Sequence, residues 1–106
     1  MGWTIVVGAD DAGFAYKEVL RDLLAADPRV DEVIDVGVHD AGPTPYPRVA
    51  VTAATAVARG EADRALLVCG TGLGVAIAAN KVRGIRAVTA HDSYSVERSV
   101  KSNNAQ

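Results

Sequence analysis

Four short runs of apolar residues recur along the chain, at residues 4–10, 32–38, 64–70 and 85–91. Glycine, acidic or histidine residues stand at the end of each run or directly after it. A continuous apolar run of this length is typical of a strand that is buried on both faces of a sheet. Because such strands occur mainly in α/β proteins, the runs predict a parallel sheet that is covered by helices.

The segments that follow these runs carry apolar residues at helical spacing. They predict helices over residues 14–27, 50–57, 73–81 and 93–102, the second of them closed by Gly60. Four βα units in sequence predict right-handed crossovers, with helices on both faces of the sheet. The apolar face expected for the first helix consists of Tyr16, Val19, Leu20, Leu23 and Leu24.

Composition narrows the classes of partner and compartment. Eleven Lys and Arg residues against thirteen Asp and Glu residues give a net charge of −2, which argues against nucleic acid or an anionic membrane as the main partner. The one cysteine cannot form an internal disulfide, which fits a reducing cytoplasm. No signal peptide and no membrane-spanning run is recognisable, so we expect a cytoplasmic domain.

The cysteine, Cys69, stands directly before a glycine-rich turn, residues 70–74, at the end of the third predicted strand. Ligands of such sheets bind beyond the carboxyl ends of the strands. The backbone N–H groups of a strand-to-helix turn can bind an anion or a developing oxyanion, and a helix start lowers the pKa of a thiol beside it. A thiolate there suits attack on a carbonyl or abstraction of a proton next to one. The structural alternative for Cys69 is a small apolar residue at a strand end.

A nucleotide site is a rival interpretation of the same turn. No Gly-Lys-Ser/Thr follows it, and Val75 occupies the last glycine position of a G-x-G-x-x-G pattern. Asp92, near the end of the fourth run, nevertheless stands where a ribose-binding acid could lie. A nucleotide-binding module and an inactive fragment therefore remain alternatives of a different class.

Polar residues at other predicted element ends are further candidates. Asp10 and Asp11 could bind substrate hydroxyls or cap the next helix, and no ligand cluster accompanies them that would predict a metal. Tyr46, between two prolines, could line the same edge or pack at a helix start. Asn103 and Asn104 follow the fourth helix, where asparagine is a common C-cap.

Taken together, the stretches GADDAGF, YP, LLVCGTGLGVAIAANKVRGIRAV and SNNAQ resemble the family of type B ribose-5-phosphate isomerases and galactose-6-phosphate isomerases. The resemblance covers the whole chain. It implies a Rossmann-like three-layer α/β sandwich and a homodimer or homotetramer that isomerises a sugar phosphate without metal or cofactor. It also implies that Cys69 is the base that moves a proton between C1 and C2 of the substrate.

Further residue roles follow from the resemblance alone. The glycine turn would hold the oxygen of an enediolate intermediate, Asn103 would bind the same intermediate, and Tyr46 would line the pocket. Thr71 is implied as a second catalytic residue, and the implied substrate-binding residues are Asp10, Asp11, Tyr46, Gly70, Gly72, Leu73, Gly74 and Asn103.

The chain departs from the family pattern at three places. The usual Asp-His after the first strand is Asp10-Asp11, and the usual His-Asn is Ser102-Asn103, so the ring-opening histidine of the ribose enzymes is absent. Family members also continue through another strand and terminal helices that carry phosphate-binding arginines. We therefore expect a single domain, residues 1–106, without that C-terminal segment.

The absent histidine has a chemical reading. A tetrose 4-phosphate stays acyclic because its 4-hydroxyl is esterified, so its isomerase needs no ring-opening acid. The stretches AVTAHDS and SVER resemble the family branch that interconverts D-erythrulose 4-phosphate and D-erythrose 4-phosphate. We expect that activity here, with ribose 5-phosphate isomerisation as the alternative.

Overall fold

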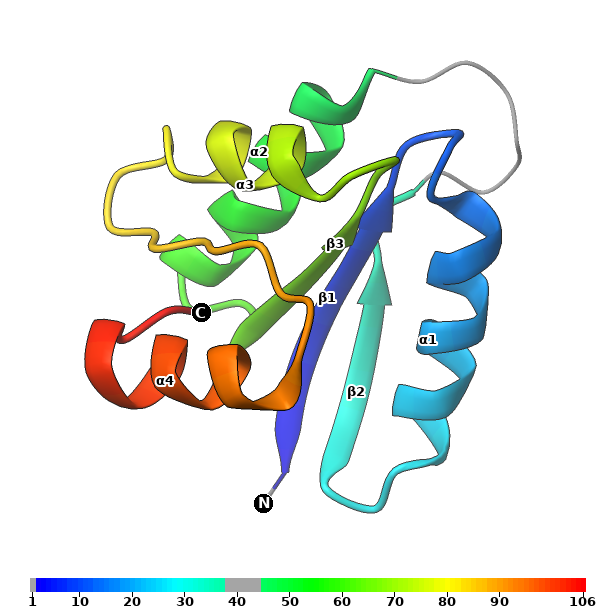
Figure 1. Ribbon diagram of the computed structural model, residues 1–106. Coiled ribbons are helices and arrows are strands. Elements are labelled where there is room, and N and C mark those ends of the chain that lie inside the picture. The colour runs from blue at the N-terminus through cyan, green and yellow to red at the C-terminus, as the bar shows by residue number, and fades with distance from the viewer. Residues whose placement is uncertain (1, 38–44) are drawn as a thin grey trace.

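The computed structural model describes residues 2–37 and 45–106 (Figure 1). Most of the predicted loop at 39–47 and the last residue of the predicted strand at 32–38 lie outside these residues. The described residues contain the strands β1 (Trp3–Ala9), β2 (Val30–Asp35) and β3 (Arg64–Val68). They also contain the helices α1 (Phe14–Ala26), α2 (Tyr46–Ala58), α3 (Leu73–Ala79) and α4 (Ser93–Asn103).

The strands form one parallel sheet in the order β2-β1-β3. β1 lies in the middle, and Val6 and Val7 in it are completely buried. Its register pairs Val7 with Asp35 of β2 and with Leu66 of β3. The predicted parallel α/β fold is therefore confirmed, and the carboxyl ends of all three strands meet at one edge of the sheet.

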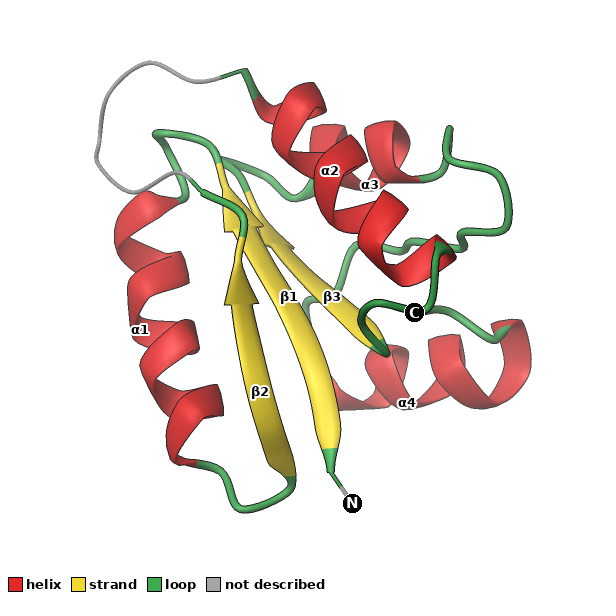
Figure 2. Cartoon of the chain, turned by 180° about the vertical axis from the view of Figure 1, so that it is seen from behind, coloured by secondary structure: helices red, strands yellow, loops and turns green. Residues whose placement is uncertain are grey.

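Helices lie on both sides of this sheet, and α1, α2 and α3 are the ones in contact with its strands. In Figures 1 and 2, α2 and α3 lie side by side on one face, while α4 lies on the opposite side of the sheet. The contact between α2 and α3 is built from small residues, which let the two helix backbones approach closely. The buried residues of this cluster are Ala50, Ala54, Val75, Ala78 and Ala79.

The burial of α1 differs from the face that the sequence predicts. Tyr16, Val19 and Leu23 have 64%, 58% and 63% of their surfaces exposed, whereas Lys17 is only 1% exposed. A hydropathy pattern assigns lysine to the solvent, but here the ammonium group has an ion-pair partner, Asp35, at the end of β2. That pairing makes the burial possible.

The fourth strand is the part of the predicted fold that is wrong, whereas the helix predicted to follow it is present as α4. Residues 85–91 form no strand of the sheet. Their burial alternates with a period of two, since Ile85, Ala87 and Thr89 are half-buried and the residues between them are exposed. The segment is thus extended, as an apolar run predicts, but it pairs with partners other than β3.

Those partners are the side chain of Asn80, which caps the C-terminal end of α3, and Gln106. The Asn80 side chain accepts a hydrogen bond from the backbone N–H of Ala87 at 2.9 Å and donates one to its carbonyl at 2.7 Å. Gln106 donates its backbone N–H to Arg86, and its own carbonyl accepts from Ala65 of β3, each at 3.1 Å. Gln106 therefore lies between β3 and residue 86, where a directly paired fourth strand would have to be.

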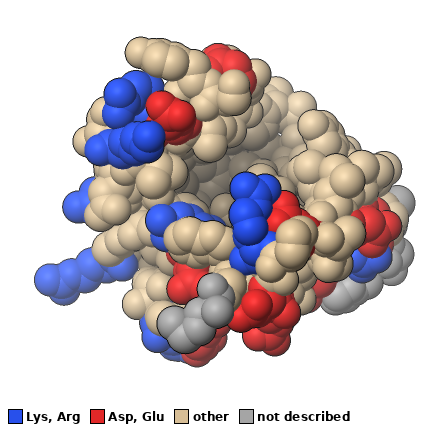
Figure 3. Space-filling model, turned by 90° about the horizontal axis from the view of Figure 1, so that it is seen from below, with Lys and Arg blue, Asp and Glu red and all other residues tan. Residues whose placement is uncertain are grey.

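A hollow opens next to this arrangement. Seen from below, the space-filling surface is deeply hollowed, with acidic and basic side chains scattered near its rim (Figure 3). A cavity of about 730 Å³ extends between β3, α1, α4 and residues 85–90. Among the described residues no helix is long and apolar enough to cross a membrane.

Candidate active site

The turn from β3 to α3 holds the thiol of Cys69 inside its own backbone. The Gly72 N–H donates a hydrogen bond to Cys69 Sγ, with a nitrogen–sulfur distance of 3.2 Å. Gly72 has a φ of +78°, a left-handed conformation that glycine adopts without strain. This conformation turns the chain back toward Cys69, so the hydrogen bond to Sγ depends on a glycine at residue 72.

The surroundings of Cys69 hold its thiol in a more acidic state than a free cysteine. Partial burial raises the pKa, but hydrogen bonds from the backbone N–H groups of Val75, Thr71 and Gly72 lower it. The negative charge of Asp10 raises it again, and the net result lies below the usual thiol pKa. A thiolate is the form that can accept a proton.

Thr71 and Thr89 brace the turn from two sides. Thr71 Oγ1 accepts a hydrogen bond from the Leu73 N–H at 3.2 Å. Thr89 Oγ1 donates to the Gly72 carbonyl at 3.1 Å, and Thr89 Cγ2 lies 3.1 Å from the place a Cβ of residue 72 would occupy. Residue 72 is therefore fixed by its conformation, by a hydrogen bond and by a close contact.

Asp10 lies beside this turn at the end of β1. Its N–H donates to the Val68 carbonyl at 3.3 Å, and its side chain is 9% exposed. Asp10 Oδ1 accepts the Gly13 N–H at 2.9 Å, so the carboxylate orders the loop before α1. The neighbouring Asp11 is exposed.

Tyr46 reaches the same region from the start of α2. Two of its ring carbons lie 2.6 Å from the position that a Cβ of Gly74 would take. The absence of a side chain at residue 74 is thus what lets the ring lie against the first turn of α3. Tyr46 is 40% exposed, which leaves part of the ring open to solvent.

The structure therefore brings most of the predicted site residues to one edge of the sheet. The 730 Å³ cavity reaches this edge and is lined there by Cys69, Gly70, Thr71 and Gly72. Deeper in, its walls are the apolar side chains of α1, β3 and α4, including Leu20, Leu66 and Val100.

Asn103 is the predicted site residue that lies elsewhere in the chain's fold. It is the last residue of α4, and Gln106 just beyond it is bound to Ala65 at the beginning of β3. Cys69 follows the other end of β3, four residues or about 13 Å further along the strand. In Figure 1, α4 crosses the lower part of the molecule, while α3 begins beside the upper ends of the strands.

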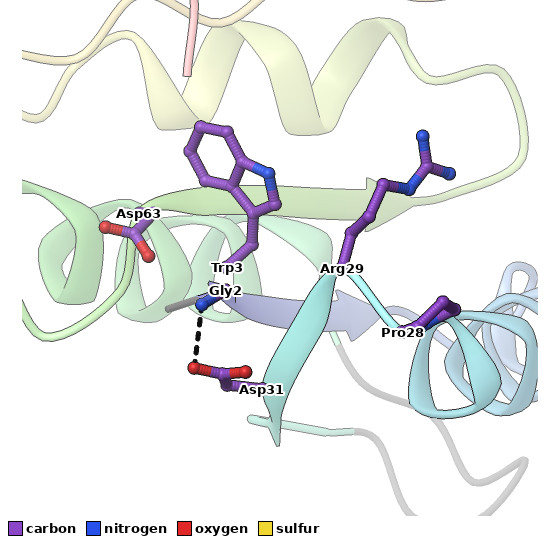
Figure 4. Close-up of a pocket in the computed structure, with 6 residues that line it drawn as sticks. All are labelled: Gly2, Trp3, Pro28, Arg29, Asp31 and Asp63. Carbon is purple, nitrogen blue, oxygen red and sulfur yellow. Dashed lines mark hydrogen bonds between the residues drawn. The ribbon is translucent and has the colours of Figure 1, made fainter.

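A second cavity, of about 580 Å³, lies at the opposite edge, near the amino end of β1 (Figure 4). The Gly2 N–H donates to Asp31 Oδ2 across it at 2.8 Å. None of the predicted site residues lines it, since its walls are Gly2, Trp3, Pro28, Arg29, Asp31 and Asp63. In the described part of the chain, no three His, Cys, Asp or Glu side chains gather in a way that could hold a metal ion.

Asp92, the acid that favoured a nucleotide site in the sequence, is the N-cap of α4. Asp92 Oδ1 accepts the Ser95 N–H at 2.6 Å, and Oδ2 accepts the Ser95 hydroxyl at 3.1 Å, so Asp92 caps α4. Asn104 has a φ of +55° and forms the C-cap of the same helix. The capping interpretation of the asparagine pair therefore applies to Asn104.

Two residues near the site were not selected from the sequence. Thr89 could have been found, because it stands near the end of an apolar run whose polar residues were expected at the functional edge. Lys17 gave no signal, because its spacing put it on the polar side of α1 and its partner Asp35 is 18 residues away.

Comparison with known proteins identifies the family. The family model described as "Ribose/Galactose Isomerase" matches residues 5–106. A curated relative, "D-erythrulose-4-phosphate isomerase 2" of Mycolicibacterium smegmatis, is 71% identical over the full chain, which covers 70% of that relative. "Ribose-5-phosphate isomerase B" of Escherichia coli is 45% identical, with 93% of this chain and 65% of the relative covered.

Solved structures agree with the sequence comparison. Ribose-5-phosphate isomerase B of Clostridium thermocellum superposes with a TM-score of 0.92 at 42% identity, covering 96% of this chain and 68% of that one. The Mycoplasma genitalium enzyme with bound ribulose 5-phosphate gives a TM-score of 0.88 at 28% identity, covering 99% and 69%. The resemblance seen in the sequence is confirmed, and the chain belongs to the ribose/galactose isomerase family of aldose–ketose sugar-phosphate isomerases.

Proposed function

We propose that this protein interconverts D-erythrulose 4-phosphate and D-erythrose 4-phosphate through an enediolate. The observation that carries the proposal is the Cys69 thiol, which the Gly72 N–H holds at 3.2 Å and whose pKa is lowered beside the cavity. The 71% identity to the D-erythrulose-4-phosphate isomerase of Mycolicibacterium smegmatis supports the choice of substrate.

In the proposed reaction the Cys69 thiolate removes a proton from C1 of the ketose. The electron pair of the broken C–H bond forms the C1–C2 double bond, and the carbonyl oxygen on C2 becomes an enediolate oxygen. Backbone N–H groups of residues 70–74 stabilise that charge, an effect worth about 10²–10³ in rate for one donor. Return of the proton to C2, with transfer of the hydroxyl proton from O1 to O2, gives the aldose.

The remaining predicted residues bind the substrate in this proposal. Asp10 and Asp11 accept hydrogen bonds from its hydroxyl groups, and Tyr46 closes the pocket over Leu73 and Gly74. Thr71 remains beside the thiol as the second catalytic residue, although an acyclic tetrose phosphate needs no ring opening.

A second copy of the chain completes the proposed site. Asn103 is the implied ligand of the enediolate, and its place at the end of α4 keeps it away from Cys69 of the same chain. A homodimer, or a homotetramer built from such dimers, would let α4 of one copy reach the turn of the other. A catalytic thiol that must stay reduced also fits a cytoplasmic location.

The test is deuterium exchange at carbon in heavy water, followed by NMR. The chain is incubated with D-erythrulose 4-phosphate or with ribulose 5-phosphate, alongside the variants Cys69→Ala and Arg29→Ala. Arg29 is 81% exposed at the opposite edge of the sheet and controls for handling of the protein.

We expect deuterium in the tetrose phosphate with the wild type and Arg29→Ala, and none with Cys69→Ala. Comparable kcat/KM on the two ketose phosphates would contradict the tetrose assignment. Exchange that persists in Cys69→Ala would contradict the role of the thiol.

A further inference from the structure

A buried lysine stands behind the proposed substrate-binding loop. Lys17 on α1 is 1% exposed, and its Nζ lies 2.8 Å and 3.0 Å from the two carboxylate oxygens of Asp35. The Arg21 guanidinium approaches the same carboxylate at 3.4 Å. Burying an ammonium is costly, and a buried ion pair is weak by itself as a source of stability. The arrangement therefore calls for a role other than stability.

The carboxylate links Lys17 to the end of the central strand. Asp35 Oδ1 accepts a second hydrogen bond, from the Gly37 N–H at 2.9 Å. Gly37 has a φ of +109°, and its carbonyl accepts the Ala9 N–H at 2.7 Å. Lys17 thus restrains the backbone of the residue that precedes Asp10.

A second path runs from Asp10 back to the same lysine. Asp10 Oδ1 accepts the Gly13 N–H, and the Gly13 carbonyl accepts the Lys17 backbone N–H, each at 2.9 Å. The side chain and the backbone of Lys17 therefore close a ring of hydrogen bonds through Asp35, Gly37, Asp10 and Gly13. These hydrogen bonds hold the loop that carries Asp10 and Asp11 at both of its ends, at Ala9 and at Gly13.

We propose that Lys17 is a positioning residue, which holds Asp10 and Asp11 at the height of the Cys69 turn through Asp35 and Gly37. This inference rests on the proposed function, because only a bound substrate makes the position of that loop consequential. A misplacement of about 1 Å in a site can cost roughly 10²-fold in rate.

The decisive variant separates positioning from stability. Lys17→Met alone leaves the Asp35 carboxylate buried beside fewer cations and can unfold the protein. Lys17→Met combined with Asp35→Asn removes both charges, and the asparagine Oδ1 can still accept the Gly37 N–H. The double variant cuts the link between α1 and the turn after β2, together with the longer contacts of Lys17 with Glu18 at 3.7 Å and of Arg21 with the Asp35 carboxylate at 3.4 Å. Arg29→Met is the matched control, because Arg29 is 81% exposed, forms a surface ion pair with Asp27 at 2.7 Å and lies at the opposite edge of the sheet from the Cys69 turn.

Two quantities are measured for each variant, and the comparison uses variants whose Tm matches that of the wild type. Amide hydrogen exchange by NMR reports the Gly13 N–H, which Asp10 itself binds, against Val6 and Val7 in the core. Steady-state kinetics on D-erythrulose 4-phosphate report KM and kcat separately.

For the double variant we expect Gly13 to exchange about 10-fold faster or more with Val6 and Val7 unchanged, and kcat/KM to fall about 10- to 100-fold. Arg29→Met should match the wild type in both. A folded double variant with normal Gly13 exchange overturns the proposal, as does faster Gly13 exchange with normal kinetics. If the wild type shows no isomerisation, the proposed function fails, while the exchange of Gly13 still decides whether Lys17 holds the loop.

Discussion

The ring of Tyr46 occupies the space that a side chain at residue 74 would need, with two ring carbons 2.6 Å from that Cβ position. Gly74→Ala should therefore destabilise the protein by about 1 kcal/mol or more through overpacking. With Tyr46→Ala in the same chain the clash is gone, and the alanine should stabilise α3 by about 0.5–1 kcal/mol. Urea denaturation of the four proteins measures both effects.

Additive effects of the two substitutions would contradict this contact. Gly70→Ala is the steric control for stability, because a Cβ there would meet only Ala12 Cβ, at the ordinary distance of 3.9 Å. Its midpoint in urea should stay near that of the wild type.

The reactivity of Cys69 should follow a pKa below that of a free thiol. Partial burial raises this pKa, the N–H groups of Val75, Thr71 and Gly72 together lower it, and the charge of Asp10 raises it, with a net lowering. Removing the charge with Asp10→Asn should lower the pKa again, so more thiolate forms at a given pH. The rate of iodoacetamide alkylation against pH gives both values. An unchanged or higher pKa of Cys69 in Asp10→Asn would show that the carboxylate does not raise the pKa of the thiol.

The cap of α4 predicts a pH-dependent stability. Hydrogen bonds from the Ser95 N–H and hydroxyl lower the pKa of Asp92 below its ordinary 3.8, so its contribution is present above that value and fades as the pH falls through the lower folded pKa. Asp92→Ala should therefore lower Tm at neutral pH, and the difference from the wild type should shrink in acid. Asp92→Asn keeps a cap without a charge and should lose less. Thermal melts from neutral pH to about pH 2 test this, and a difference that stays constant with pH would exclude the charge as its cause.

Two inactive chains should complement each other if Asn103 acts across a dimer. Cys69→Ala and Asn103→Ala each damage every site of their own homodimers. In a mixed dimer one site carries both defects and the other none. Random exchange of subunits at equal amounts should then restore about a quarter of the wild-type activity. Mixtures that stay inactive after exchange, shown by mass spectrometry of the mixed dimer, would place Asn103 and Cys69 in the same subunit's site.

The three strands of the sheet could be predicted because each coincides with an apolar run in the sequence, although only β1 contains fully buried residues. Residues 85–91 carry the same pattern and are extended, yet they pair with Asn80 and Gln106 instead of β3. Hydropathy predicts how deeply a strand is buried. It does not predict which backbone groups will form hydrogen bonds with that strand. The neighbour of an extended segment is a property of the tertiary structure, so this assignment was wrong.

The candidate site likewise contains residues whose proximity the sequence could predict and residues for which it could not. Cys69, Gly70 and Gly72 follow one another in a single turn, so their proximity was available from the sequence. Lys17 lies on the side of α1 that hydropathy assigns to solvent, and only the approach of β2 brings Asp35 to it. The path of α4, which takes Asn103 toward the beginning of β3, likewise depends on contacts far apart in the chain.

The hydrogen bonds of Gln106 to Ala65 and Arg86 have a practical consequence for anyone who alters this end of the chain. Gln106 is held on both sides, so any residues joined after it start from a fixed position between β3 and residue 86, beside the apolar cavity. The apolar side chains of a sequence added there, such as a purification tag, would compete for the walls of that cavity.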